Sequence, residues 1–176
     1  LRNVLEPAFP GFVEFNEHPT HDDVVRIDII ESDSPYLTGV LDSDDDPQWW
    51  LEGSSYPIRV LDKEKVRVLI TSRELGEKYG EEPVAVVFNF GKGEVFHMIS
   101  HYFLQRAEFR NTRHQKTAAS YAADKGVPFD KPMADMASDL YLYEVEAAAT
   151  SSRMFANIAS EKKRRFLEEQ RRRQQD

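Results

Sequence analysis

The sequence predicts an α/β domain, a layered sheet with helices on both faces, followed by a long C-terminal helix. Residues 66–71 and 83–90 are apolar, β-branched segments that predict two strong strands. Residues 94–99 form a third apolar run, and the Gly-Lys-Gly turn at 91–93 indicates a hairpin between the last two strands. Nearly continuous apolar runs are typical of strands that are covered on both faces, which is why helices are expected on either side.

Shorter elements precede these strands. Apolar residues at the start of the chain share one face of a predicted helix, and Pro7 and Pro10 end this helix. Alternating or β-branched residues then predict three further strands, at 11–16, 24–30 and 57–61. The intervening segments have loop chemistry, with a polar connection at 73–82 and a turn-like stretch at 48–56 that contains two tryptophans.

The C-terminal third changes to a helical pattern. Residues 101–125 predict one or two helices, and a cluster of Gly and Pro then breaks the chain. From Met133 to about Arg173 there is neither Pro nor Gly. A narrow stripe on one helical face is formed by Ser151, Phe155, Ile158, Lys162 and Phe166, and Met154 adds to it. We therefore divide the chain into an α/β portion, 1–132, and a helical extension, 133–176, that packs on the sheet first and then becomes charged and exposed.

Composition restricts the function classes. A chain of 176 residues with 40% hydrophobic residues fits one domain with an appendage and a real core. The net charge of -8 argues against general nucleic-acid binding, and the absence of cysteine excludes disulfides, thiolate metal sites and cysteine nucleophiles. Neither a membrane-spanning run nor a signal peptide is visible, so we expect a cytoplasmic protein. We also predict no cofactor.

The end of the strand region carries a family resemblance. Residues 66–102 resemble the C-terminal half of a class I glutamine amidotransferase-like domain, in particular its ThuA-like branch. The shared order of elements is strand, polar connection, strand, Gly-Lys-Gly turn and strand. Loop residues 34–40 and helix residues 151–159 are similar to the corresponding elements of that branch. The resemblance implies a three-layer, flavodoxin-like sheet, incomplete in this chain because the early strands are missing.

The departures from the family concern its chemistry. Working amidotransferases use a cysteine on a strand-to-helix elbow and a histidine–glutamate pair on a late strand. This sequence has no cysteine, and no His-Pro-Glu follows His97 or His101, which fall near the position of the family histidine. The resemblance therefore implies the scaffold and not the reaction, and we predict no catalytic residue.

Two histidines and three aromatic residues form the candidate ligand site. His97 lies on the last predicted strand and His101 just past it, near the end of the sheet where ligands usually bind in open α/β folds, but a core histidine and a helix-capping one are the competing interpretation. The aromatic rings could line a cleft for a sugar, as ThuA-like proteins have been linked to sugar metabolism, or could pack in the core. The candidates are His97, His101, Trp49, Trp50 and Tyr56.

A metal site is the third alternative. Two imidazoles and two carboxylates in a turn can bind zinc or another divalent ion, although a solvated turn has the same composition. The candidate ligands are His18, His21, Asp22 and Asp23.

Charge is distributed unevenly along the chain. Residues 161–176 hold seven Lys/Arg and four Asp/Glu, a balance of +3, so the remaining 160 residues carry -11. A basic helix end can dock on an acidic partner, on RNA or on the acidic body of a second copy, or can simply keep the helix solvated. The candidate partner-binding residues are Lys162, Lys163, Arg164, Arg165 and Phe166.

We therefore predict a non-catalytic interaction or scaffold domain that binds a protein partner or self-associates. The alternatives are a ThuA-like small-molecule domain and a metal-binding module.

Overall fold

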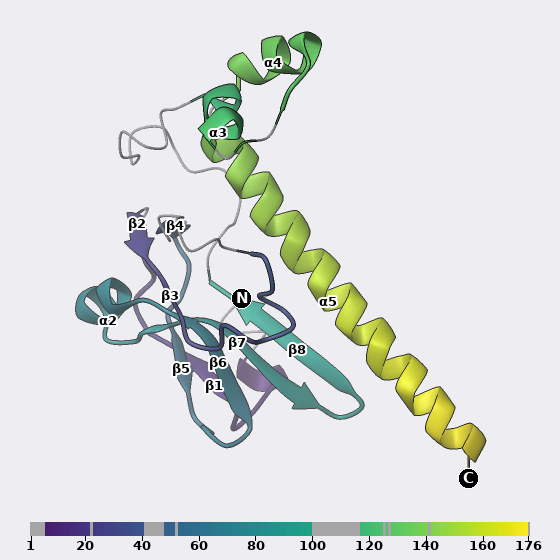
Figure 1. Ribbon diagram of the computed structural model, residues 1–176. Helices are drawn as coiled ribbons and strands as arrows, with labels where there is room; N and C mark the ends of the chain where they lie inside the picture. The colour runs from purple at the N-terminus through teal and green to yellow at the C-terminus, as the bar shows by residue number, and fades with distance from the viewer. Residues whose placement is uncertain are drawn as a thin grey trace. The chain divides into compact units, whose positions relative to one another are not determined.

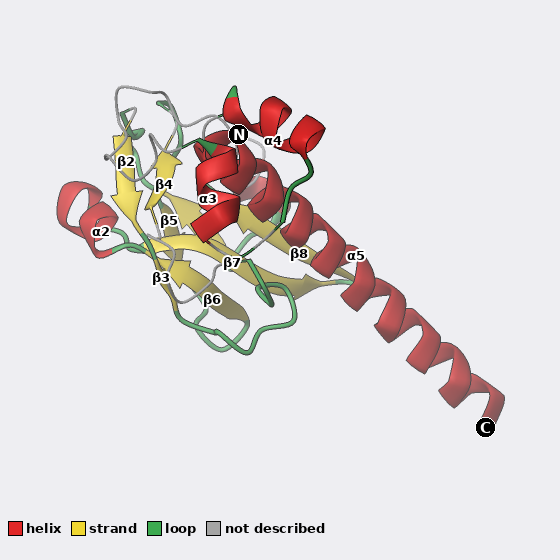
Figure 2. Ribbon diagram, turned by 45° about the horizontal axis from the view of Figure 1, so that its top comes forward, coloured by secondary structure: helices red, strands yellow, loops and turns green. Residues whose placement is uncertain are grey.

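The apolar segments of the sequence form strands in three antiparallel sheets, all within one of two compact units (Figures 1 and 2). The computed structural model describes residues 6–21, 23–40, 48–51, 53–99, 117–124, 126, 128–140 and 142–175. Unit 1 comprises Leu1–Ser34 and Leu41–His101, and unit 2 comprises Pro35–Val40 and Tyr102–Asp176.

The largest sheet has four strands in the order β3-β6-β7-β8. Its strands are β3 (Asp28–Ile29), β6 (Val66–Thr71), β7 (Pro83–Phe90) and β8 (Gly93–Met98). The Gly-Lys-Gly hairpin is confirmed, because Phe90 pairs with Gly93, and Gly91 in the turn has a φ of 59° that suits glycine. Residues 84–88 of β7 are all buried, so this central strand is covered on both faces as predicted.

The prediction of an α/β protein is confirmed at the level of a mixed helix and strand structure. The flavodoxin-like three-layer arrangement is not confirmed, because every described strand pair is antiparallel and a flavodoxin-like sheet is built from parallel strands. One face of β7 is covered by the turn that precedes β1 instead of by a helix. There Phe12 stacks on Phe88 with the ring centroids 4.9 Å apart, and Phe9 meets Phe88 edge-on at 5.5 Å.

Two small antiparallel sheets complete the strands of unit 1. In the first, β1 (Val13–Phe15) pairs with β5 (Ile58–Val60). In the second, β2 (Asp23–Arg26) pairs with β4 (Gln48–Leu51), a strand in a segment predicted to be turn-like. The single strand predicted at 24–30 is therefore divided, since β2 and β3 pair with different partners.

The polar connection predicted at 73–82 contains a helix, α2 (Arg73–Tyr79). The side chain of Ser72 accepts a hydrogen bond from the backbone N–H of Leu75 at 3.2 Å, and Leu75 is the buried residue of the helix. Gly80 ends the helix at a φ of 83°, the left-handed conformation that glycine adopts without strain. Both caps were present in the sequence, so this helix was predictable from its ends.

Unit 2 is built around one long helix, α5 (Leu142–Gln175), preceded by α3 (Ala118–Asp124) and α4 (Lys131–Ser138). The predicted long helix is confirmed, although it begins at Leu142 and a separate short helix precedes it. Segment 35–40, which we call the strap, belongs to the same unit. Asn157 of α5 donates to the carbonyl oxygens of Tyr36 and Thr38 at 3.0 and 2.9 Å, which holds the strap against the helix.

Candidate functional site

Among the candidate ligand-binding residues whose side chains the structure describes, His97 has an unusual environment. It lies on β8 opposite Val86, and its ring meets that of Phe15 edge-on with the centroids 5.3 Å apart. Its Nε2 is buried and has no hydrogen-bond partner among the described residues. Burial disfavours the charged imidazolium and lowers the pKa of His97 from 6.5 to about 4. The imidazole is therefore neutral near pH 7, and no carboxylate among the described residues pairs with it to orient a catalytic base.

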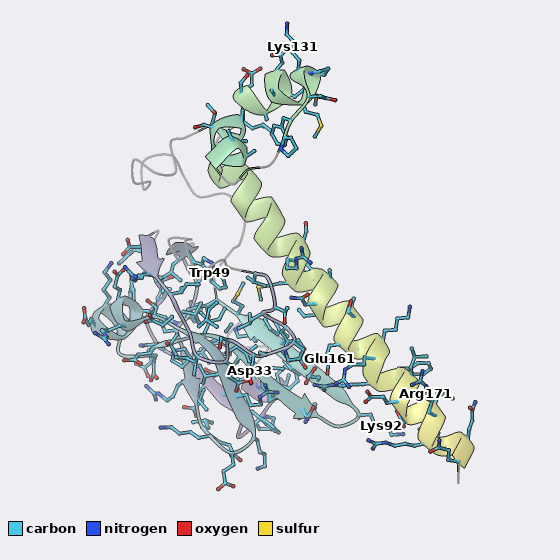
Figure 3. All side chains as sticks on the ribbon, viewed as in Figure 1. Asp33, Trp49, Lys92, Lys131, Glu161 and Arg171 are labelled. Atoms are coloured by element: carbon cyan, nitrogen blue, oxygen red, sulfur yellow. The ribbon has the colours of Figure 1, made fainter. Side chains whose placement is uncertain are left out.

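The other candidates for this site come from different parts of unit 1. Trp49 is buried on β4, as the core interpretation predicted, and Figure 3 labels it. Tyr56 is partly exposed in the segment before β5. Trp50 pairs with Val24 in the backbone register of β4, while its side chain and the whole of His101 lie outside the described residues.

The candidate metal ligands that the structure describes lie in and beside a polar turn whose groups bond to residues of α2. His18 and His21 are exposed, and the backbone N–H of His21 donates to the hydroxyl of Tyr79 at 3.0 Å. The carboxylate of Asp23 pairs with Lys78, whereas Asp22 is not among the described residues. Within the described part of the chain, no group of three or more His, Asp or Glu side chains is arranged to hold a metal ion.

The basic segment of α5 contains an ordered ion-pair cluster around Glu161. This carboxylate accepts hydrogen bonds from Arg164 at 2.6 and 2.8 Å and from Arg165 at 2.7 Å. The hydrogen bonds from Arg164, followed by those from Arg165, lower the pKa of Glu161 from 4.5 to about 2 against the opposing effect of burial. Arg165 also donates to the hydroxyl of Tyr36 at 2.8 Å, which links the cluster to the strap.

The predicted partner-binding residues therefore divide into two groups. Arg164 and Arg165 are engaged within unit 2, and Arg164 also pairs with Glu168 at 2.6 Å. Lys162, Lys163 and Phe166 are exposed. Figure 3 shows Glu161 midway along α5 and Arg171 nearer its C-terminal end.

Exposed apolar side chains are concentrated in unit 2. Of nine large apolar residues that are exposed in the described part of the chain, six belong to this unit: Met133, Met136, Leu140, Phe155, Phe166 and Leu167. Phe155 is 65% exposed and Phe166 is 58% exposed, although both belong to the stripe predicted from the sequence. Among the residues of α5 whose burial is described, Met154 and Glu161 are buried, and they lie on a different face.

Sequence reasoning identified Phe166 but not the contribution of Phe155 or the two methionines to an exposed surface. Met133 and Met136 are three residues apart on α4, which places them on one helical face. That spacing was a signal in the sequence, but the same spacing is also typical of a buried face.

No protein-family model matches this chain, and neither a curated protein nor a solved structure matches it. The resemblance to amidotransferase-like domains therefore stays a prediction. None of the described helices is both long enough and apolar enough to cross a bilayer.

Proposed function

We propose that this chain is a non-catalytic interaction module whose unit 2 provides the binding surface. The observation that supports it is the concentration of exposed large apolar residues in that unit, six of the nine in the described chain. Contiguous or aligned apolar residues at a surface favour protein association, because contact removes them from water.

The arrangement of α5 supports the same proposal. One face of the helix is occupied, since Asn157 and Arg165 donate to the strap and Glu161 is buried. Phe155 and Phe166 lie on another face and are more than half exposed. The helix is therefore held on one face and exposes aromatic rings on another. Aromatic residues are enriched at the centre of protein interfaces, so this exposed face suits a binding surface.

We further propose that the scaffold of unit 1 is a degenerate amidotransferase-like domain. Its support is the order β6, α2, β7, β8 with a Gly-Lys-Gly turn, the order on which the sequence resemblance depends. The lack of cysteine and the unpartnered, neutral imidazole of His97 favour a scaffold without amidotransferase chemistry.

Affinity capture with matched variants tests the interaction function. The immobilised chain is incubated with extract from its source cells, and retained proteins are identified by quantitative mass spectrometry. We expect identified proteins to be retained by the unaltered chain and by Ile30→Ser, which alters an exposed apolar residue of unit 1. The same proteins should be depleted at least about tenfold on Phe155→Ser/Phe166→Ser, because truncating aromatic residues at the centre of an interface commonly costs about 2 kcal/mol. Equal retention on the double variant would contradict the proposal.

A small-molecule-binding function of the ThuA-like kind is the second candidate. The buried, unpartnered Nε2 of His97 favours it, because a ligand hydroxyl would satisfy that nitrogen. Adding monosaccharides and their phosphates should then shift the NMR signals of the His97 ring. Signals that stay unchanged throughout the panel would remove this candidate.

A further inference from the structure

We infer that the exposed stripe of α5 binds an acidic amphipathic helix of a partner protein. The inference rests on the proposed interaction function and names the chemistry of the partner. It depends on two features of the described residues, the spacing of the exposed stripe and the charge within it.

The spacing is that of a helix–helix seam. Phe155, Ala159, Lys162 and Phe166 are all exposed and follow one another at intervals of four, three and four residues. Such alternation of four and three is the pattern by which one helix packs along another in a coiled coil. The two phenylalanines are eleven residues apart, so they differ by only about 20° around the helix and lie about 16 Å apart along it. The stripe is narrow, which suits a second helix better than the wide apolar face that lies on a membrane.

Lys162, within the stripe, and its neighbour Lys163 carry positive charges that none of the described carboxylates of α5 neutralises. Three of the seven cations in residues 161–176, Arg164, Arg165 and Arg173, pair with glutamates of the same helix. Lys162 and Lys163 have no ion pair among the described residues. The positions three and four residues on either side of them also offer no carboxylate: they are Ile158, Ala159, Ser160, Arg165, Phe166 and Leu167. Helical ion pairs form at those separations, so α5 cannot neutralise these two lysines itself.

A partner helix that covers the two phenylalanines also covers Lys162, which lies between them. Enclosing an unpaired ammonium in an apolar interface is costly unless a carboxylate meets it. The partner therefore needs apolar residues that match Phe155 and Phe166, with Asp or Glu at the level of Lys162 and Lys163. This requirement selects an acidic helix by charge complementarity.

A second copy of α5 fits this stripe poorly. In a parallel pair, Lys162 would face its own counterpart. In an antiparallel pair with Phe155 beside Phe166, the lysines of both copies would lie within about one turn of each other. Glu161, the nearest acidic residue, is buried and already accepts from two arginines. Like charges at a helix seam act against self-association.

Two synthetic helical peptides test the inference on the full chain. Both carry leucines spaced to meet Phe155, Ala159 and Phe166, and they differ only at the positions that face Lys162 and Lys163. One peptide has glutamates there and the other has lysines. Fluorescence anisotropy should show at least about tenfold tighter binding of the glutamate peptide, with an affinity that falls as salt is added.

Charge reversal supplies the matched controls. Lys162→Glu/Lys163→Glu should abolish or invert the preference, since both side chains are exposed and their replacement leaves the buried face of α5 intact. Lys131→Glu reverses the charge of one exposed lysine of α4, labelled in Figure 3, and should leave the preference as it was. Circular dichroism checks that each variant keeps its helix content.

Each other outcome overturns the inference and separates it from the proposed function. Equal binding of both peptides, lost in Phe155→Ser/Phe166→Ser, would overturn the acidic partner but keep the interaction module. Binding of neither peptide, with binding to vesicles of anionic phospholipid, would assign the stripe to a membrane surface. A dimer seen by light scattering that Phe155→Ser/Phe166→Ser dissociates would assign the stripe to a second copy. Binding of neither peptide, no vesicle binding, no dimer and failed capture from extract would overturn both.

Discussion

Replacing His97 by phenylalanine should remove a large part of the acid sensitivity of unit 1. In the folded protein, burial lowers the pKa of His97 from 6.5 to about 4, whereas the unfolded chain keeps a value near 6.5. Between these two values the unfolded state binds a proton that the folded state does not bind. The free energy of unfolding therefore falls as the pH is lowered through this interval. A phenylalanine cannot titrate, and it can keep the edge-on contact with Phe15.

The size of the effect follows from the two pKa values. One pH unit corresponds to about 1.4 kcal/mol, so lowering the pH from 7 to 4.5 should cost the wild-type chain about 2 to 3 kcal/mol through His97 alone. The carboxylates add their own pH dependence, but they are common to the wild type and the variant. The difference between the two chains isolates the histidine.

Urea unfolding followed by circular dichroism at pH 7 and pH 4.5 measures this difference. His18→Phe makes the same substitution at an exposed histidine and should lose as much stability as the wild type. The NMR titration of the His97 ring should have its midpoint well below 6.5. A His97→Phe chain that loses as much stability as the wild type between these pH values would refute the reasoning.

Three further predictions concern contacts within each unit. Ser72→Ala removes the cap of α2 and should lower the free energy of unfolding of unit 1 by about 1 kcal/mol in urea titrations. Asn157→Ala removes the hydrogen bonds that this side chain donates to the carbonyls of Tyr36 and Thr38 and should cost about 1 kcal/mol. Hydrogen exchange should become faster in unit 2 alone, and an equal change in both units would contradict this. Because the folded pKa of Glu161 is about 2, the cluster around it should lose its stabilising effect as the pH falls from 4.5 towards 2. Glu161→Gln should lack that transition in helix content measured by circular dichroism, and a transition identical to that of the wild type would exclude this cause.

The sequence predicted where strands form better than how they pair. The apolar run of β7 correctly indicated burial on both faces, and Val84 and Val86 are fully buried. Such a run carries no information on strand direction, because a central antiparallel strand covered by Phe9 and Phe12 needs the same residues as a parallel strand covered by helices. The division of segment 24–30 was also hidden, since its partner strands, β4 and β6, are distant in the sequence.

The candidate surface was only partly predictable for a similar reason. A stripe at helical spacing shows which residues share a face of α5 but does not show which face is buried. Met154 and Phe155 are neighbours in the sequence, yet Met154 is 1% exposed and Phe155 is 65% exposed. The strap contributes to this difference in exposure. Asn157 and Arg165 donate hydrogen bonds to it, so the face of α5 that carries them is directed towards the strap. That contact joins residues more than a hundred positions apart, which no local pattern reveals.

The contact between the strap and α5 cannot form until late in the synthesis of the chain. Tyr36 is synthesised 121 residues before Asn157 and 129 residues before Arg165, the two side chains of α5 that donate to it. At ribosomal rates of about 5 to 20 residues per second, that separation lasts on the order of ten seconds. During this time the strap has been made but its helix has not. A fragment that contained only residues 102–176 would likewise lack part of its own unit, so unit 2 cannot be excised as one continuous piece.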